Sequence, residues 1–198
     1  FPCKPWEIQG KLYDVSLRKS KQGNERAVEV VLSKKGVGEV FPTMVGYVEG
    51  VDESHGHYHI YDALSRHFVA EKPQMMIKTG DFVSFAPIIP VEDKFKSAAV
   101  INVMPHDEGL TAFGTFQAVA TYVNPTDGYL RYRITSPIKE TPEGKITEEG
   151  FASLVNVKDD ELRKSLKVGD NIRLLLFLKR GKDGVKRNHV AAVIRNLL

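Results

Sequence analysis

The chain has 198 residues, of which 42% are apolar and 27% are charged. This composition is typical of a globular protein and excludes a disordered one, and the length suits two β modules of about 100 residues each. No stretch approaches the roughly 18 consecutive apolar residues of a membrane span. The single cysteine, Cys3, favours a reducing compartment, so we expect an intracellular protein of the cytoplasm or nucleus.

The net charge of +3 is unevenly distributed along the chain. Residues 1–108 contain 13 basic and 15 acidic residues, a net charge of −2, whereas residues 109–198 contain 15 and 10, a net charge of +5. An excess of Lys and Arg is what a polyanionic ligand such as nucleic acid requires. The second half is therefore the better candidate for such a ligand, and the first half for a protein partner.

Strands dominate the predicted elements of the first half. Segments rich in Val, Ile, Phe and Tyr, separated by Gly, Pro or charged turns, are typical of strands. They cover residues 7–17 and 26–32, which form an opening hairpin, and then 40–51, 57–70, 81–89 and 97–104.

The second half continues in the same style. The strand predicted at 113–123 alternates and should place Phe116, Ala118, Ala120 and Tyr122 on one face. Asp127-Gly128 predicts a tight turn before a strand at 129–134. The remaining elements are a polar loop over 137–150, a short helix over 159–166, and two final strands around a turn at 180–184. The helix is indicated by acidic residues at its start and basic residues near its end.

An internal repeat divides the chain. Lys78, Gly80 and Asp81 in the segment 77–85 recur 89 positions later in the segment 166–174, and the segment 98–101 recurs 93 positions later at 191–194. Each copy predicts a charged turn, an apolar strand and a closing strand whose paired alanines allow tight packing in a barrel. The boundary falls in Pro-His-Asp-Glu-Gly at 105–109, which predicts modules 1–107, with the additional hairpin, and 108–198.

Both copies resemble the cold-shock and related OB-fold families, whose modules end in L-x-x-G-D-x-V-x-F, a basic or glycine-containing turn, and A-x-x-V. The resemblance implies an all-β chain of two small OB-like β-barrels in tandem, with one short helix in the second. In these families, aromatic residues on two adjacent strands stack bases. Residues 56–60 and 66–69 are similar to those strands in the first module, and 127–132 to the first of them in the second. The modules are longer than a minimal cold-shock domain, and the aromatic motifs are incomplete.

The candidate nucleic-acid-binding residues are flat rings for stacking and cations for phosphate contact. In the first module they are His57, Tyr58, His59, Tyr61, His67 and Phe68. In the second they are Tyr129, Arg131, Tyr132 and Arg133, followed by the hairpin tip residues Lys179, Arg180, Lys182, Lys186 and Arg187. A polar strand face and a solvated hairpin explain the same residues without a ligand.

Three functions remain open on the sequence alone. The first is binding of single-stranded RNA or DNA, with RNA favoured. The second is a protein-interaction or assembly module of a viral or ribonucleoprotein complex. The third is a metal-dependent enzyme, because His55, His57 and His59 alternate along one predicted strand. The sequence contains neither a GxxxxGK[ST] phosphate loop nor a Gly-x-Ser-x-Gly elbow, so we expect a binding protein without a catalytic site or cofactor.

Overall fold

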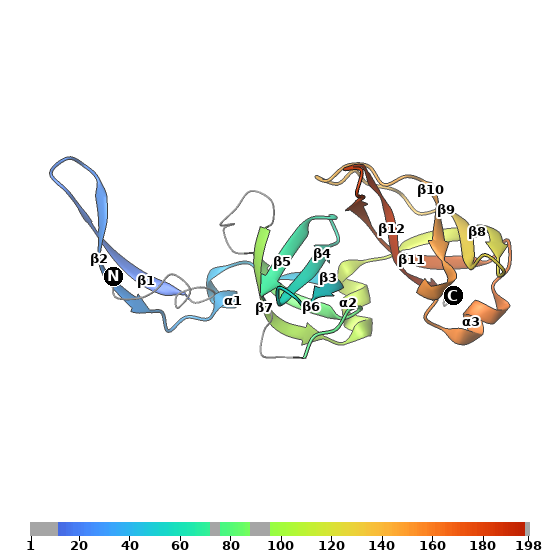
Figure 1. The fold of residues 1–198 in the computed structure, drawn as a ribbon, viewed down its shortest axis with the longest axis horizontal. Coiled ribbons are helices and arrows are strands. Elements are labelled where there is room, and N and C mark those ends of the chain that lie inside the picture. The colour runs from blue at the N-terminus through green and yellow to red at the C-terminus, as the bar shows by residue number, and fades with distance from the viewer. Residues whose placement is uncertain (1–11, 72–75, 88–95, 197–198) are drawn as a thin grey trace.

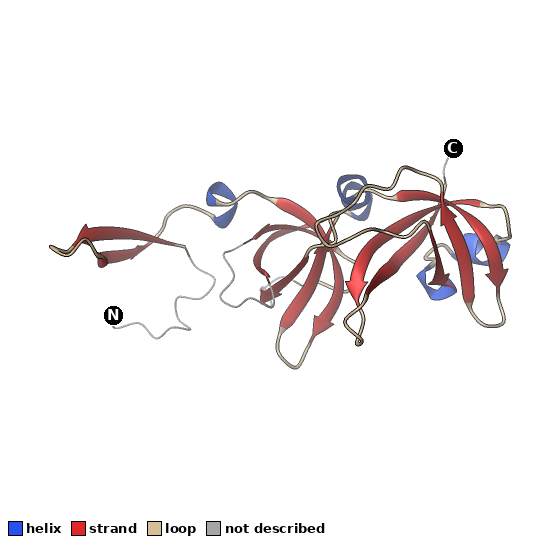
Figure 2. Cartoon of the chain, turned by 90° about the horizontal axis from the view of Figure 1, so that it is seen from above, coloured by secondary structure: helices blue, strands red, loops and turns tan. Residues whose placement is uncertain are grey.

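The computed structural model describes residues 12–71, 76–87 and 96–196 and is mainly β (Figure 1). A long hairpin precedes a first barrel, and a second barrel follows in series, as the view from above also shows (Figure 2). No helix within these three ranges is long and apolar enough to cross a membrane.

The opening hairpin consists of β1 (Tyr13–Lys19) and β2 (Glu25–Leu32) and extends away from both barrels (Figure 1). Its pairing places large apolar side chains on one face, and the exposed ones include Val15, Leu17, Val30 and Leu32. The short helix α1 (Val37–Val40) follows it. Residues 7–11, where the sequence predicts the start of this hairpin, lie outside the described residues.

The first barrel is closed by five strands, in the order β3-β4-β5-β7-β6. These are β3 (Met44–Asp52), β4 (His57–Asp62), β5 (His67–Glu71), β6 (Phe82–Pro87) and β7 (Lys96–Met104). Only the β5–β7 pair is parallel among the described pairings of this barrel. This is the five-stranded Greek-key barrel of the OB fold. The predicted strand segment 57–70 contains two strands, β4 and β5, joined by a tight turn, as the resemblance of 56–60 and 66–69 to two adjacent strands implies.

The second module repeats this strand order in an incompletely closed form. Its strands are β8 (Phe116–Asn124), β9 (Tyr129–Ile134), β10 (Glu149–Ser153), β11 (Asn171–Arg180) and β12 (Lys186–Arg195). Their order, β10-β9-β8-β11-β12, matches that of the first barrel opened between its third and fifth strands.

The seam between β10 and β12 is joined by isolated contacts. Val157 and Val193 form one parallel bridge, and the Asn156 amide donates to the Val190 carbonyl over 2.7 Å. The 310 helix η2 (Leu154–Asn156) places Asn156 at this point. Among the described residues, one bridge and one side-chain hydrogen bond therefore join this seam where the first barrel has a strand ladder, and the second barrel stays incompletely closed.

The repeated turn has the same hydrogen bonds in both barrels. The Gly80 amide donates to Val48 over 2.8 Å, and the Gly169 amide donates to Ala120 over 2.8 Å. The following aspartate closes the turn, because the Asp170 carboxylate accepts from the Lys167 amide over 2.9 Å, as Asp81 does in the first copy. The repeat predicted from the sequence is thus confirmed at the level of individual bonds.

Strand pairing confirms the predicted alignment of the two copies. Ala86 pairs with Ala99 in the first barrel, and Leu175 pairs with Ala192 in the second. The alanines themselves have different surroundings: Ala98 lies in the first barrel's core, whereas Ala191 and Ala192 face the other barrel. Tight packing within a barrel therefore explains Ala98 but not Ala191 and Ala192.

Two helices accompany the barrels. The helix α3 (Asp160–Ser165) confirms the prediction for 159–166, and the Asp159 carboxylate caps it by accepting from the Glu161 and Leu162 amides. The helix α2 (His106–Phe113) links the barrels, so the predicted boundary between residues 107 and 108 falls inside it. Gly109 lies against the Phe82 ring, where a Cβ atom would clash.

The two barrels share a hydrophobic cluster. Tyr47 and Tyr61 from the first barrel, Phe113 from α2, and Leu175 and Phe177 from β11 are all buried in it. The Tyr61 and Phe177 rings stack with their centroids 4.3 Å apart. Such a contact removes water from large aromatic surfaces on both sides, so the barrels pack as neighbours instead of being joined by a free linker.

A buried hydrogen bond completes this interface. The Leu178 amide donates to the Ser65 hydroxyl over 2.9 Å. Ser65 has a positive φ of 63° and is buried, and its turn is held by Asp62, which accepts from the Arg66 amide and guanidinium. The turn between β4 and β5 therefore satisfies a backbone donor of the second barrel.

The repeated turn provides a stability test. Gly169 has a φ of +94°, and an added Cβ would meet no atom within 4 Å. Gly169→Ala should therefore lower the free energy of unfolding through backbone strain alone, by about 1–2 kcal/mol, measured by urea denaturation. Gly50→Ala is the control, since Gly50 has equal free space and no positive φ. Equal effects of the two substitutions would contradict the strain argument.

Candidate nucleic-acid interface

The outward face of β9 carries three of the four strand residues predicted for the second module. Its alternation directs Leu130, Tyr132 and Ile134 into the core and Tyr129, Arg131 and Arg133 outward. Tyr132 is only 1% exposed, and its hydroxyl accepts from the Asn188 amide over 3.1 Å. The prediction that Tyr132 is an exposed stacking ring is therefore wrong, because strand periodicity makes it a core residue.

A row of side chains crosses three strands of this face. Arg131 lies opposite Tyr122 of β8 on one side and opposite Phe151 of β10 on the other. The Tyr122 and Phe151 side chains are 43% and 73% exposed. The Arg131 guanidinium carbon lies 5.9 Å from the centre of the Tyr122 ring. Two exposed rings with a guanidinium between them form a platform for stacking.

A β-bulge turns Tyr122 outward. The β8–β9 pairing shifts register between Ala120 and Tyr122, so that the intervening Thr121 has no partner on β9. The bulge changes which face the following residue occupies. The prediction that Tyr122 shares a face with Phe116, Ala118 and Ala120 is therefore wrong.

The turn after β8 supports this end of the row. The Asp127 amide donates to the Asn124 side chain over 3.0 Å, and the Asn124 amide group donates to Asp127 and to the Tyr122 hydroxyl. The Tyr122 and Tyr129 ring centres are 5.8 Å apart. The predicted Asp-Gly turn thus also positions an aromatic pair.

The basic hairpin tip lies between β11 and β12, and ion pairs occupy three of its five cations. Lys179 pairs with Glu49 of the first barrel, Lys186 with Glu143, and Arg187 with Asp183. The Arg187 hydrogen bonds lower the pKa of Asp183 to about 2. Among the described ion pairs, none involves the exposed Arg180 or Lys182.

The corresponding face of the first barrel meets the second barrel. Tyr58 and Phe68 are core residues, each 2% exposed, and Tyr61 is buried against Phe177. The prediction that these three rings are exposed for stacking is therefore wrong. His67 stacks on Tyr61 at 4.7 Å, and His59 lies 3.1 Å from His67 between ring nitrogens.

The two barrels differ at the positions of the row. Strand pairing aligns Tyr122, Arg131 and Phe151 of the second barrel with Gly50, His59 and Val69 of the first. The first barrel therefore lacks both rings and the guanidinium.

The predicted histidine face does not form a metal site. His55 lies in the turn after β3 and contacts Asp52 over 2.8 Å, whereas His59 faces His67. His57 stacks on His55 at 6.3 Å. In the three described ranges, no group of three or more His, Cys, Asp or Glu residues is placed to hold a metal ion.

The sequence matches no protein-family model and no curated protein. Among solved structures, a chain described as Drosophila Unr CSD456 is similar, with a TM-score of 0.35 and 12% sequence identity. The similarity covers 79% of this chain and 61% of the Unr chain, so this chain spans less than two thirds of that structure.

Sequence reasoning missed Tyr122 and Phe151. Phe151 lies between the small residues Gly150 and Ala152, which face the crowded core. In a strand, neighbouring side chains point to opposite faces, so a large ring between two small inward residues points outward. The outward position of Tyr122 depends on the bulge, for which the sequence offers no comparable signal.

His67, beside the barrel interface, is sensitive to pH. Burial lowers the pKa of His67 from its usual 6.5 to about 4, and His59 and Lys179 act in the same direction against Glu49 and Glu143. The folded protein keeps His67 neutral at a pH where the unfolded chain protonates it. Its contribution to stability is complete above about pH 6.5 and is lost as the pH falls towards 4.

His67→Phe tests this dependence, because it keeps a ring against Tyr61 and removes the titrating group. The free energy of unfolding in urea should fall less between pH 7 and pH 4.5 than in the wild type. His106→Gln, at an exposed position on α2, should keep the wild-type loss. The argument fails if His67→Phe and the wild type lose the same amount.

Proposed function

We propose that this protein binds single-stranded nucleic acid through its second barrel, with RNA preferred to DNA. The observation that carries the proposal is the exposed row of Tyr122, Arg131 and Phe151. Unpaired bases stack on such rings, and a guanidinium between them can stack or neutralise a phosphate. The row supports a binding module and not a catalyst.

The basic residues around the row extend the proposed footprint. Tyr129 and Arg133 share the outward face of β9 with Arg131. Arg180 and Lys182 are available for phosphates at the hairpin tip, whereas Lys179, Lys186 and Arg187 already hold carboxylates. The net charge of +5 in residues 109–198 attracts a polyanion to this half.

Two substitutions test the row. Phe151→Ala and Arg131→Ala should each weaken binding about tenfold, since stacking is worth roughly 1–3 kcal/mol per base. Fluorescence anisotropy with labelled 10-nucleotide single strands measures the change. Val155→Ala and Lys158→Ala are matched controls, because both positions are exposed outside the row. Affinity of the wild type should fall steeply as salt rises.

The same assay separates the parts of the proposal. Absence of binding at low salt, or equal binding of duplex and single strands, would remove single-strand recognition. Equal affinity for RNA and DNA of one sequence would remove only the RNA preference.

The β1–β2 hairpin favours a second role, association with another protein. Among the described residues its two strands form a sheet of their own, with an exposed apolar face that includes Val15, Leu17 and Leu32. A two-stranded hairpin by itself is marginally stable in water. Light scattering over a concentration series tests association between copies. Leu17→Lys should lower the apparent mass at high concentration, and a wild type that stays monomeric throughout would exclude a second copy as the partner.

A further inference from the structure

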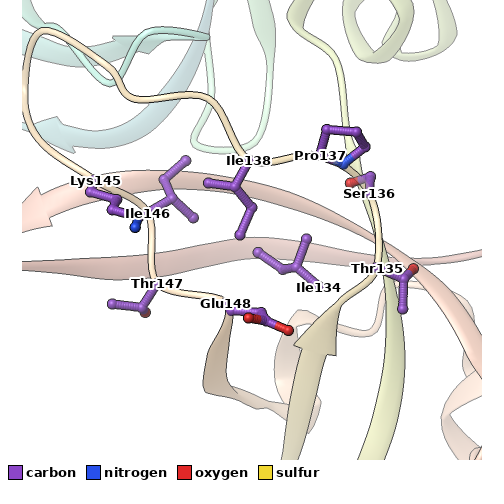
Figure 3. A pocket seen from close by; sticks show the side chains of 9 residues that line it. All are labelled: Ile134, Thr135, Ser136, Pro137, Ile138, Lys145, Ile146, Thr147 and Glu148. Carbon is purple, nitrogen blue, oxygen red and sulfur yellow. The ribbon is translucent and has the colours of Figure 1, made fainter.

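An open pocket of about 730 Å³ lies at the end of β9 (Figure 3). Its apolar lining consists of Ile134, Pro137, Ile138 and Ile146. Ile134 and Ile146 belong to the barrel core and are only 4% and 1% exposed, so Pro137 and Ile138 are the apolar side chains that a ligand can contact. Polar side chains, including Lys145 and Glu148, complete the lining. The lining combines apolar and polar side chains, and the volume is within the range of small-ligand sites.

The loop that forms the pocket is held in place by β12. The Thr147 amide donates to the Asn188 side chain over 3.1 Å, and the Asn188 amide group donates back to the Thr147 carbonyl over 2.8 Å. Lys186 binds both the carbonyl and the carboxylate of Glu143 near the loop's tip. The pocket is therefore formed before any ligand binds, which lowers the entropic cost of occupying it.

The pocket continues the proposed nucleic-acid path. The outward side chains of β9 are Tyr129, Arg131 and Arg133, and Thr135 follows them at the pocket. At about 3.3 Å per residue, Thr135 lies roughly 13 Å along the strand from Arg131. One bound strand can therefore reach both the row and the pocket.

The charged groups at the pocket favour a particular base. Among the described ion pairs and hydrogen bonds, none involves the side chains of Lys145 or Glu148. An ionised carboxylate only accepts hydrogen bonds. Guanine presents two neighbouring donors, N1–H and the N2 amino group, on its Watson–Crick edge. Adenine and cytosine present one donor beside an acceptor, and uracil presents one donor between two carbonyls.

We propose that the pocket binds one unstacked guanine of the single strand, with Glu148 accepting from N1–H and N2 and the base packed on Pro137 and Ile138. Lys145 is placed to contact a neighbouring phosphate. The proposal rests on the proposed function and adds a base preference to it, because single-stranded bases are commonly read on their Watson–Crick edges.

Oligouridine 10-mers with one central G, A or C test the preference by fluorescence anisotropy. The wild type should bind the G-containing strand about tenfold more tightly than oligouridine, as expected of a bidentate base contact. Glu148→Gln should lose this difference and keep the affinity for oligouridine. Glu140→Gln, in the same loop but outside the lining, should behave as the wild type.

A second variant tests the volume of the pocket instead of the Glu148 carboxylate. Ile138→Phe should fill part of the pocket, and it too should remove the preference for G without changing oligouridine binding. Retention of the preference in both variants would overturn the pocket proposal while leaving the row intact. A wild type that binds all four strands equally would also overturn it, and one that binds none at low salt would overturn the proposed function as well.

Discussion

The hydrogen bonds between the Lys-x-Gly-Asp turn and the first strand organise each barrel. In the second barrel, Ala120 bonds to this turn on one side and pairs with Tyr132 of β9 on the other. Ala120 is fixed by hydrogen bonds to the turn and by pairing with β9, so the unpaired residue of β8, Thr121, follows it directly and forms the bulge. The bulge turns Tyr122 to the surface. The same turn that organises the barrel therefore also positions Tyr122 at the end of the row with Arg131 and Phe151.

The two barrels share this scaffold and differ in how their outer faces are used. In the first, Tyr61 and Ser65 contact Phe177 and Leu178 of its neighbour. In the second, the equivalent region presents Arg131 and exposed rings to solvent. An OB barrel offers one face for ligands, and here the first barrel's face partly supports the second barrel. The first barrel therefore supports its neighbour through this face, and the second barrel keeps the same face open to solvent.

Charge follows the same division. The hairpin tip of the second barrel is rich in Lys and Arg, yet Lys179 reaches Glu49 of the first barrel and Lys186 fixes the loop through Glu143. These pairs position the tip and the loop, while Arg180 and Lys182 take part in none of the described ion pairs. A count of basic residues alone overstates the charge available for phosphate binding, because part of it is neutralised within the fold.

Local patterns in the sequence were sufficient for most strands, the capped helix α3 and the duplicated turn, because each depends on neighbouring residues. They missed β10 at Glu149–Ser153, where the sequence predicts no strand. They also identified Arg131 and Tyr129 by alternation along one strand. The burial of Tyr58 and Phe68, the outward position of Tyr122, and the docking of Tyr61 on Phe177 could not be predicted in this way. Each depends on pairing or packing between segments distant in sequence: a bulge changes strand faces, and the contact of two barrels decides which outward rings stay accessible.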